Sequence, residues 1–508
     1  MRFNTKKEEE GKVRNHEGTE AFVMTPELEL YTAAVTASLS DKFYETNDEQ
    51  MNRIASLIAK VDPMFVAQLA VYTRTQMYLR SVPLLLLVEL AKVHSGDNLV
   101  SRAVAQTVLR ADEITELLAC YQSRNPSKDE RKKLGKLSHQ IQVGLQQAFN
   151  RFDEYQFAKY DRDGADVKLR DALFLVHPKA KDEAQQVLFD KITNKSLAIP
   201  YTWETELSAL GQQKFENDEE RASAFREKWE ELIDSGKVGY MALIRNLRNI
   251  LESRVSVEHI QKVCNLLSDP KAVANAKQLP FRYLAAYREV QEITSTSTAT
   301  VLSALEDATL CSASNIEGVG ANTKVLLLAC DVSGSMCRSI SPRSKVESYD
   351  IGLMLAMMLK SHCSQVISGI FGDTWLPINL PQGGILANTK ALRSHGNKVG
   401  FNTNGHLVID WLIEHNEIMD KVMMFTDCQM WDSHGGNASI RKSWHRYKDI
   451  APNAKLYLFD LAGYGQMPLS MAEKDVYLIA GWSDKIFEVL QAIEEGGNAI
   501  ETISNVKI

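Results

Sequence analysis

The spacing of apolar residues divides the chain into two parts. From Pro26 to about Val290, apolar positions recur every three or four residues, which predicts one amphipathic helix after another. From Lys324 onward, short unbroken apolar runs alternate with helical patterns, which is typical of βαβ units in a parallel sheet. The sequence therefore predicts an all-α module followed by a doubly wound α/β domain.

The helices of the first part are expected to stack as hairpins. Helix pairs of this size bury their apolar faces only against neighbouring pairs, as in an α-solenoid. The residue letters show no strict repeat, so this expectation rests on the periodicity alone. Polar residues 1–24 are expected to form a flexible arm, followed by the helical module at residues 25–314. Glycine-rich residues 315–322 are expected to link this module to the α/β domain at residues 323–508.

Five apolar runs in the second part are candidate strands, because each is too short for a typical helix. They are Lys324–Cys330, Gln365–Phe371, Lys421–Phe425, Lys455–Leu461 and Val476–Ala480. Candidate helices lie between or after them, at Tyr349–His362, Leu407–His415, Ile440–Tyr447 and Asp484–Ile493. Open sheets of this kind bind ligands at the carboxyl ends of their strands.

Small oxygen-bearing side chains follow the first of these strands. Asp331, Ser333 and Ser335 alternate in the loop that begins where the apolar run stops. Thr403, before a predicted helix, and Asp427, at the end of another strand, add two further oxygen donors. Two carboxylates and three hydroxyls suit Mg²⁺ or Mn²⁺ and leave a coordination position for a partner's oxygen. Taken singly, Thr403 could instead cap its helix, and Asp427 could cap a turn.

A basic cluster lies in the middle of the helical part. It consists of Arg124, Lys128, Arg131, Lys132, Lys133 and Lys136. Such a run is either a solvated loop, which is the commoner case, or a face that contacts nucleic-acid phosphates. Farther along, His177 precedes Pro178, and proline disfavours a helical conformation in the residue before it. On the residues alone, His177 therefore marks the end of a helix.

Composition and charge narrow the class of protein. The 508 residues carry a net charge of −7, which argues against a generally basic nucleic-acid binder but leaves room for a local basic face. Seven scattered cysteines form no disulfide framework and no zinc-binding spacing, which fits a reducing, cytoplasmic setting. The charged N-terminus has no apolar signal segment, and no apolar run approaches the ~20 residues of a membrane span.

These features together resemble a known family. The loop Asp331-Val-Ser-Gly-Ser335, with Thr403 and Asp427, is similar to the metal-ion-dependent adhesion site of von Willebrand factor A domains. The helical part resembles the TROVE module, so the whole chain is similar to bacterial or phage members of the Ro autoantigen family. The segments that carry this likeness are Phe152–Tyr160, Leu169–Lys179, Met241–Arg248 and Leu279–Leu284.

The resemblance implies a ring of HEAT-like helical repeats followed by an A-type domain. Ro-family proteins bind small non-coding Y RNAs on the outside of the ring and single-stranded 3′ ends of misfolded RNAs in its hole. Bacterial members associate with a 3′ exoribonuclease through the Y RNA. The family's RNA contacts cluster in the segment that matches Lys159, Arg162, His177 and Lys179, so the resemblance assigns these four residues to RNA.

Three functions are therefore considered. The first is a non-catalytic RNA-binding scaffold in RNA quality control or decay, which would also use the basic residues Arg131, Lys132, Lys133 and Lys136. The second is an adaptor whose metal ion binds a carboxylate of a protein partner. The third, an enzyme, is disfavoured because the sequence has no clear general base, no Ser/His/Asp set and no nucleotide-binding loop.

Overall fold

The computed structural model forms two compact units. It describes residues 12–37, 44–126, 136–313, 326–341, 344–363, 365–434, 438–470, 473–483 and 485–508. The first unit comprises residues 1–51, 244–248 and 260–502, and the second comprises residues 52–243, 249–259 and 503–508. The predicted linker at residues 315–322 lies outside the described ranges.

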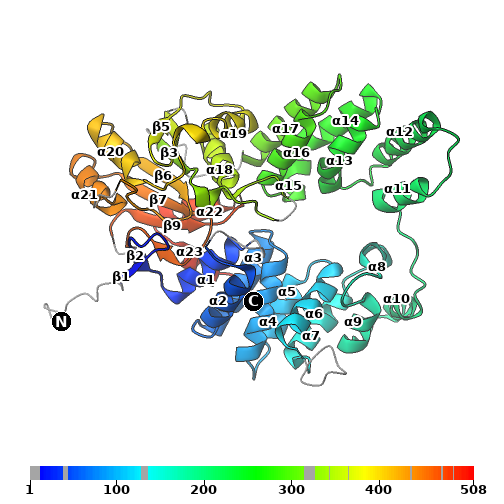
Figure 1. The fold of residues 1–508 in the computed structure, drawn as a ribbon. Helices are drawn as coiled ribbons and strands as arrows, with labels where there is room; N and C mark the ends of the chain where they lie inside the picture. The colour runs from blue at the N-terminus through cyan, green and yellow to red at the C-terminus, as the bar shows by residue number, and fades with distance from the viewer. Residues whose placement is uncertain are drawn as a thin grey trace. The chain divides into compact units, whose positions relative to one another are not determined.

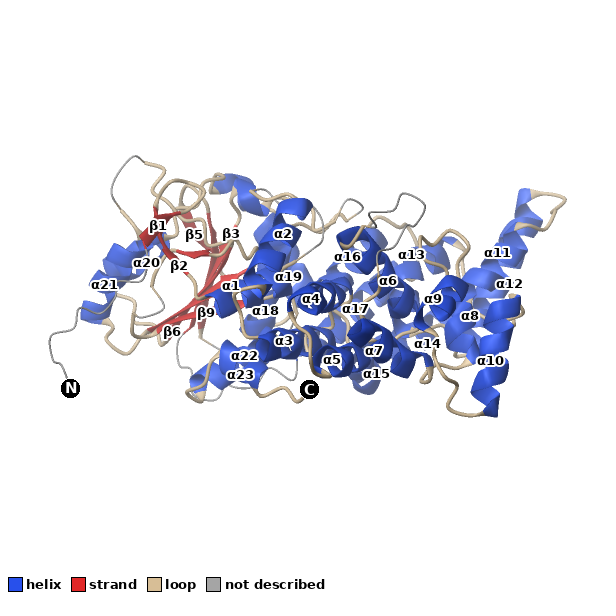
Figure 2. Ribbon diagram, turned by 90° about the horizontal axis from the view of Figure 1, so that it is seen from below, coloured by secondary structure: helices blue, strands red, loops and turns tan. Residues whose placement is uncertain are grey.

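The second unit is helical in its described residues (Figures 1 and 2). Its helices are α3 (Pro63–Thr75), α4 (Ser81–Val93), α5 (Leu99–Thr107), α6 (Asp112–Arg124), α7 (His139–Phe149), α8 (Glu154–Tyr160), α9 (Leu169–Val176), α10 (Glu183–Asn194), α11 (Trp203–Gly211) and α12 (Asp218–Asp234). Residues of α2 (Asn47–Ile58), α13 (Tyr240–Glu252), α14 (Val257–Ser268) and α23 (Ala499–Ser504) are divided between the two units. Neighbouring helices pack on one another, as α3 does on α4 and α5 does on α7.

Local sequence explains where several of these helices begin and end. At the start of α3, the Asp62 carboxylate accepts hydrogen bonds from two backbone N–H groups, and Pro63 occupies the first helical position. Asp153 and Gln156 form a reciprocal capping box at the start of α8. Helix α9 ends at His177, whose φ of 48° is left-handed, and Pro178 follows. The prediction that His177 ends a helix is confirmed.

The first unit contains a six-stranded sheet in the order β5-β4-β3-β6-β7-β9. Its strands are β3 (Leu326–Asp331), β4 (Val366–Phe371), β5 (Trp375–Pro377), β6 (Lys421–Thr426), β7 (Lys455–Asp460) and β9 (Val476–Ala480). All pairings are parallel except that of the edge strand β5 with β4. Strand order reverses between β3 and β6, which places a ligand-binding position at the carboxyl ends of these two strands.

Helices cover both faces of this sheet. They are α18 (Ser348–His362), α19 (Ile385–Arg393), α20 (His406–Glu414), α21 (Ile440–Ile450) and α22 (Ile486–Glu494), with short 3₁₀ turns at Gly334–Met336 and Gly396–Lys398. Figure 1 shows α20 and α21 on one side of the strands and α18 and α22 on the other. The fully buried pattern of β3 and β6 explains their unbroken apolar sequences. The predicted fold class, a helical module followed by a doubly wound α/β domain, is confirmed.

The N-terminal segment differs from its prediction. Lys12–Arg14 (β1) and Glu20–Val23 (β2) form an antiparallel hairpin, and β2 also pairs with β8 (Gln466–Met467). The next helix, α1 (Pro26–Val35), contributes Tyr31, whose hydroxyl donates a hydrogen bond to the Ala480 carbonyl at 3.0 Å. The prediction of a flexible arm is therefore wrong for residues 12–24. These residues are ordered because β8, more than 440 positions along the chain, supplies a partner strand for β2.

The last helices before the sheet also belong to the first unit. They are α15 (Pro270–Ala276), α16 (Phe281–Gln291) and α17 (Thr298–Ala313). Arg288 on α16 pairs with Asp350 on α18 through contacts of 2.8 and 2.6 Å, and Arg393 on α19 pairs with the same carboxylate at 2.6 Å. Glu306 on α17 accepts hydrogen bonds from the backbone N–H groups at the start of α19. The compact unit therefore begins well before residue 323, where the α/β domain was expected to start.

No helix in the described ranges of the chain has both the length and the apolar character that a membrane crossing requires.

Candidate functional site

The predicted metal ligands lie on three loops that hydrogen bonds hold side by side. Asp331 ends β3 and Asp427 directly follows β6, so both lie at the reversal point of the sheet. The backbone N–H of Gly334 donates to the Phe401 carbonyl at 2.8 Å, which joins the loop after β3 to the loop before α20. The Trp431 N–H donates to the Thr403 carbonyl at 3.2 Å, which joins that second loop to the loop after β6.

Hydrogen bonds orient the carboxylate and hydroxyl groups of the first loop. One oxygen of Asp331 accepts from the Ser333 backbone N–H at 2.9 Å, and the other accepts from the Thr426 hydroxyl at 2.7 Å. The hydroxyls of Ser333 and Ser335 lie 3.1 Å apart. All these residues are buried or nearly so, and the loop therefore presents a fixed set of oxygens.

One carboxylate oxygen of Asp427 is buried without a hydrogen-bond partner among the described residues, and a bound cation would satisfy it. Its Oδ1 accepts a hydrogen bond from the Gln429 backbone N–H at 3.0 Å, whereas no donor in the described residues reaches its buried Oδ2. Burial raises the pKa of both carboxyl groups, and the charge of Asp331 raises the pKa of Asp427 further. Two neighbouring buried carboxylates destabilise each other's ionised form, and a bound divalent cation would remove that repulsion.

The donor set therefore fits a small hard cation such as Mg²⁺. Among the described residues, no group of three or more His, Cys, Asp or Glu side chains is placed to hold a metal ion. Two carboxylates supplemented by hydroxyls and waters are the ligands that Mg²⁺ accepts, whereas zinc prefers nitrogen and sulfur. Helix α20 is preceded by Gly405, not Thr403, and no side chain caps it, so the structure does not support helix capping as the role of Thr403.

Sequence reasoning missed the residues that support this centre. Thr426 and Gln429 hold the two carboxylates, and the N-terminal hairpin holds the loop after β6. The Asn15 side chain donates to the Met430 carbonyl at 2.9 Å, and the His16 backbone N–H donates to the Gln429 side chain at 2.9 Å. The position of Thr426 next to Asp427 was a usable signal, whereas nothing local in the sequence points to the hairpin.

The basic cluster is only partly described. Arg131, Lys132 and Lys133 lie outside the described residues, as does Lys128. Lys136 is exposed, and its backbone carbonyl accepts a hydrogen bond from the Tyr121 hydroxyl at 2.8 Å. Arg124 instead forms an ion pair inside the helical module, where its guanidinium lies 2.5 Å from the carboxylate of the largely buried Glu89.

The four residues assigned to RNA by resemblance are all exposed in the second unit. Lys159 lies in the last turn of α8 and Arg162 follows it, while His177 and Lys179 follow α9. The segment after α9 is held through its backbone, because Asn150 donates to the Lys179 carbonyl at 2.8 Å and Gln146 to the His177 carbonyl at 3.2 Å. The contacts that hold this segment thus use main-chain oxygens and leave the basic side chains at the surface.

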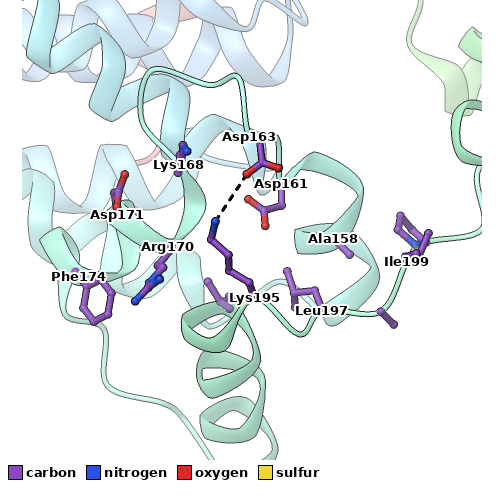
Figure 3. Close-up of a pocket in the computed structure, with 13 residues that line it drawn as sticks. Ala158, Asp161, Asp163, Lys168, Arg170, Asp171, Phe174, Lys195, Leu197 and Ile199 are labelled. Carbon is purple, nitrogen blue, oxygen red and sulfur yellow. Dashed lines mark ion pairs between the residues drawn. The ribbon is translucent and has the colours of Figure 1, made fainter.

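Beside these residues lies a hollow of about 710 Å³ that sequence reasoning missed (Figure 3). Its charged lining comes from three cations, Lys168, Arg170 and Lys195, and from three carboxylates, Asp161, Asp163 and Asp171. None of the four assigned residues lines it. Lys168 and Arg170 lie in a predicted helical segment and were a usable signal. Lys195, at the end of α10, comes to this place only through the packing of the helices.

Comparisons with known proteins place the chain in a family. The sequence matches the TROVE domain over residues 27–198 and 195–317, and the Ro60 vWA domain over residues 325–493. Telomerase protein component 1 of Rattus norvegicus is 24% identical over 344 residues, which cover 52% of this chain and 13% of the rat protein. The Mus musculus protein of that name is 39% identical over 97 residues, which cover 19% of this chain and 3% of the mouse protein. The chain thus spans only a small part of the length of these relatives.

A solved structure gives the same picture of the fold. The crystal structure of the Ro (RSR) protein of Deinococcus radiodurans superposes with a TM-score of 0.58 and 19% sequence identity. The alignment covers 93% of this chain and 100% of that chain. The TROVE match alone extends over more than half of the 508 residues, and a Ro60-type A domain follows it. The chain therefore belongs to the Ro family of TROVE-domain proteins.

Proposed function

We propose that this chain is a non-catalytic RNA-binding protein. It binds a small non-coding, Y-like RNA and the single-stranded 3′ ends of misfolded RNAs, and it serves as a scaffold in RNA quality control or decay. A 3′ exoribonuclease is the partner that the family likeness favours. The seven free cysteines favour a reducing compartment such as the cytoplasm.

The observation that carries this proposal is a group of unneutralised cations around α8 and α9. In the described residues, no carboxylate lies within 4 Å of the charged groups of Lys159, Arg162, Lys168, Arg170 or Lys179. Other cations of the same unit are paired, such as Lys191, whose ammonium lies 2.6 Å from Glu154. Cations without an acidic partner within 4 Å are available to phosphates. The five cations exceed the four carboxylates of the same segment, Asp161, Asp163, Asp166 and Asp171, by one, against a net charge of −7 for the chain.

Salt-dependent binding tests the proposal. Fluorescence anisotropy would follow a labelled RNA hairpin with a single-stranded 3′ tail at NaCl concentrations from about 50 to 200 mM. We expect the binding constant to fall steeply with salt, because each neutralised phosphate releases counterions. Replacing both Lys159 and Arg162 by Ala should weaken binding and reduce the logarithmic salt slope by about 1 to 2. Lys398→Ala, at an exposed position on the A-type domain, is a control for the loss of a surface cation elsewhere in the chain and should leave binding unchanged.

Two results would overturn the proposal. One is the absence of salt-sensitive binding to either the hairpin or the tailed RNA. The other is degradation of the RNA by the purified protein in the presence of Mg²⁺, if Asp427→Ala abolishes it, because that result would make the metal centre catalytic.

A second function is favoured by the buried Oδ2 of Asp427, which no donor in the described residues reaches. This deficit supports an Mg²⁺ site with an open coordination position that accepts a carboxylate of a protein partner. The proposed metal ligands belong to the first unit, and the cations around α8 and α9 belong to the second. Asp331→Ala should therefore abolish Mg²⁺ binding in calorimetry and leave RNA binding unchanged. Unaltered Mg²⁺ binding in this variant would remove the adaptor function.

A further inference from the structure

The hollow in the second unit has the size of a ligand site. Figure 3 shows its walls, which come from the end of α8, the start of α9 and the segment 195–200 that follows α10. Its volume of about 710 Å³ lies within the range of roughly 300 to 1,000 Å³ that small-ligand pockets occupy.

Part of this lining is apolar and exposed. Phe174 on α9 is 48% exposed, and Ile199 in the segment after α10 is 86% exposed. Leu197 lies between Lys195 and Ile199 in the same segment (Figure 3). The Arg170 guanidinium lies 5.6 Å from the centre of the Phe174 ring, so the pair offers a flat cationic and aromatic surface. Flat nucleobases stack on surfaces of this kind without the need for a particular sequence.

The cations of the hollow are available to a ligand. Lys195 reaches from the end of α10 toward Asp163, and the two charged groups are 3.9 Å apart (Figure 3). Their side chains are 58% and 94% exposed, so solvent screens the pair and it contributes little to stability. A phosphate can therefore replace Asp163 as the partner of Lys195 at small cost, with Lys168 and Arg170 in the same lining.

Asp161 supplies an acceptor that the protein leaves unused. It follows α8, where its backbone N–H donates to the Phe157 carbonyl at 2.9 Å. In the described part of the chain, no group donates a hydrogen bond to its carboxylate, and no cation lies within 4 Å of it. Burial raises the pKa of this carboxyl group, the charge of Asp163 raises it further, and Lys195 and Lys168 lower it. Asp161 is exposed, so a ligand that brings hydrogen-bond donors to its carboxylate would take the place of water there.

We propose that this hollow holds one nucleotide of single-stranded RNA and selects guanine. The inference rests on the proposed RNA-binding function and names the base at one position of the RNA. The guanine face packs on Leu197 and Ile199, its Watson–Crick edge meets Asp161, and its phosphate meets Lys195. Phe174 and Arg170 stack with the neighbouring base.

Donor geometry selects guanine over the other bases. Guanine presents its N1–H and N2–H donors side by side, and they match the two oxygens of a carboxylate. Adenine and cytosine each present one amino group beside an acceptor nitrogen, and uracil presents one N–H between two carbonyls. A carboxylate accepts one hydrogen bond from each of these three bases and faces at least one repelling lone pair.

Binding of short RNAs tests the inference on the unaltered protein. Fluorescence anisotropy would compare a uridine hexamer with hexamers that carry one central G, A or C. A bidentate contact discriminates by a factor of about ten, so the hexamer with G should bind about tenfold more tightly than the other three. The hexamer with G carries only one guanine, which avoids the association of strands into quadruplexes.

Asp161→Asn separates base selection from phosphate attraction. The variant loses a negative charge, so the plain uridine hexamer should bind equally well or more tightly, whereas the preference for G should fall to less than about twofold. Asp166→Asn is the matched control, because Asp166 is an exposed carboxylate of the same loop and does not line the hollow. It removes the same charge and should keep the full preference. Lys195→Ala should weaken all four hexamers alike.

The outcomes distinguish this inference from the proposed function. Salt-sensitive binding of all four hexamers with equal affinity would overturn the guanine site and leave the RNA-binding function intact. An Asp161→Asn variant that keeps the tenfold preference would also overturn the site. If neither the hexamers nor the tailed hairpin bind, the proposed function and the guanine site both fail.

Discussion

The carboxylate of Asp350 is the clearest place to test how the helical part of the first unit is joined to the sheet. It is 0% exposed and accepts four hydrogen bonds, three from the guanidinium groups of Arg288 and Arg393 and one from the Glu347 backbone N–H at 2.8 Å. Asp350→Ala would leave two guanidinium groups and one backbone N–H without this partner.

The cost of that change follows from burial. Removing one partner of a buried ion pair costs about 3 to 5 kcal/mol. The side chains of Arg288 and Arg393 are 20% and 32% exposed, so water can partly solvate them once Asp350 is removed. We therefore expect Asp350→Ala to lower the free energy of unfolding by about 3 kcal/mol, the lower end of that range. With about 2 °C of melting temperature per kcal/mol for a large domain, the transition of the first unit should fall by about 6 °C.

Differential scanning calorimetry would measure this shift, and hydrogen exchange would show whether α18 and α19 lose protection. Glu289→Ala is the control, because Glu289 lies on α16 next to Arg288 and pairs with Lys345 at 2.5 Å and with Arg248 at 3.8 Å. The side chains of Glu289, Lys345 and Arg248 are 35%, 71% and 57% exposed. An exposed pair contributes at most about 1 kcal/mol, or about 2 °C. If the two variants shift the transition equally, the reasoning from burial is wrong.

Three further predictions concern the metal centre and the helix packing. The buried carboxyl groups of Asp331 and Asp427 have raised pKa values, so protons compete with Mg²⁺ for them as the pH falls. Mg²⁺ should therefore raise the melting temperature more at about pH 8 than at about pH 5.5, and equal increases at both pH values would contradict this. A Cβ at Gly144 would lie 2.6 Å from the Val104 Cβ. Gly144→Ala should therefore lower the free energy of unfolding, measured in urea, by about 1 to 3 kcal/mol, and a more stable variant would refute the close approach of α5 and α7. Asn15→Ala removes the hydrogen bond to the Met430 carbonyl and the two that the Asn15 side-chain oxygen accepts from the Glu17 and Thr19 N–H groups, so it should cost about 1 to 3 kcal/mol of unfolding free energy. It should also weaken Mg²⁺ binding in calorimetry, whereas unchanged affinity would show that the hairpin does not position the centre.

Local pattern was sufficient for the main elements of the fold. Strands β3 and β6 are buried on both faces, and this burial leaves a continuous apolar run that can be read without knowledge of the partner strands. The edge strand β5 was missed because it has three residues, ends in Pro377 and lies antiparallel on one side of the sheet. Helix α19 was also missed, and its start is set by Glu306 of α17, which accepts hydrogen bonds from its first N–H groups.

The candidate sites show a similar limit. Asp331, Ser333 and Ser335 occupy one short loop after a strand, so their spacing alone predicted a cation-binding group. The proposed guanine site combines Asp161 and Lys195, which are 34 positions apart in the sequence and line one hollow only because the segment after α8 and the end of α10 come together in the fold. Residue pattern reports which side chains an element carries, whereas a binding surface depends on which elements become neighbours.

The pairing of Val23 with Gln466 has a consequence for synthesis of the chain. At about 5 to 20 residues per second, the ribosome needs roughly 20 to 90 s to add the residues that separate these two partners. During that interval the hairpin of β1 and β2 has no strand to pair with, and for most of it the loop after β6 has not yet been made. Contacts so distant in sequence are slow to form, so the hairpin is added to the sheet late. Residues 12–23 are therefore among the last of this unit to reach their final positions, although they are made long before their partner strand.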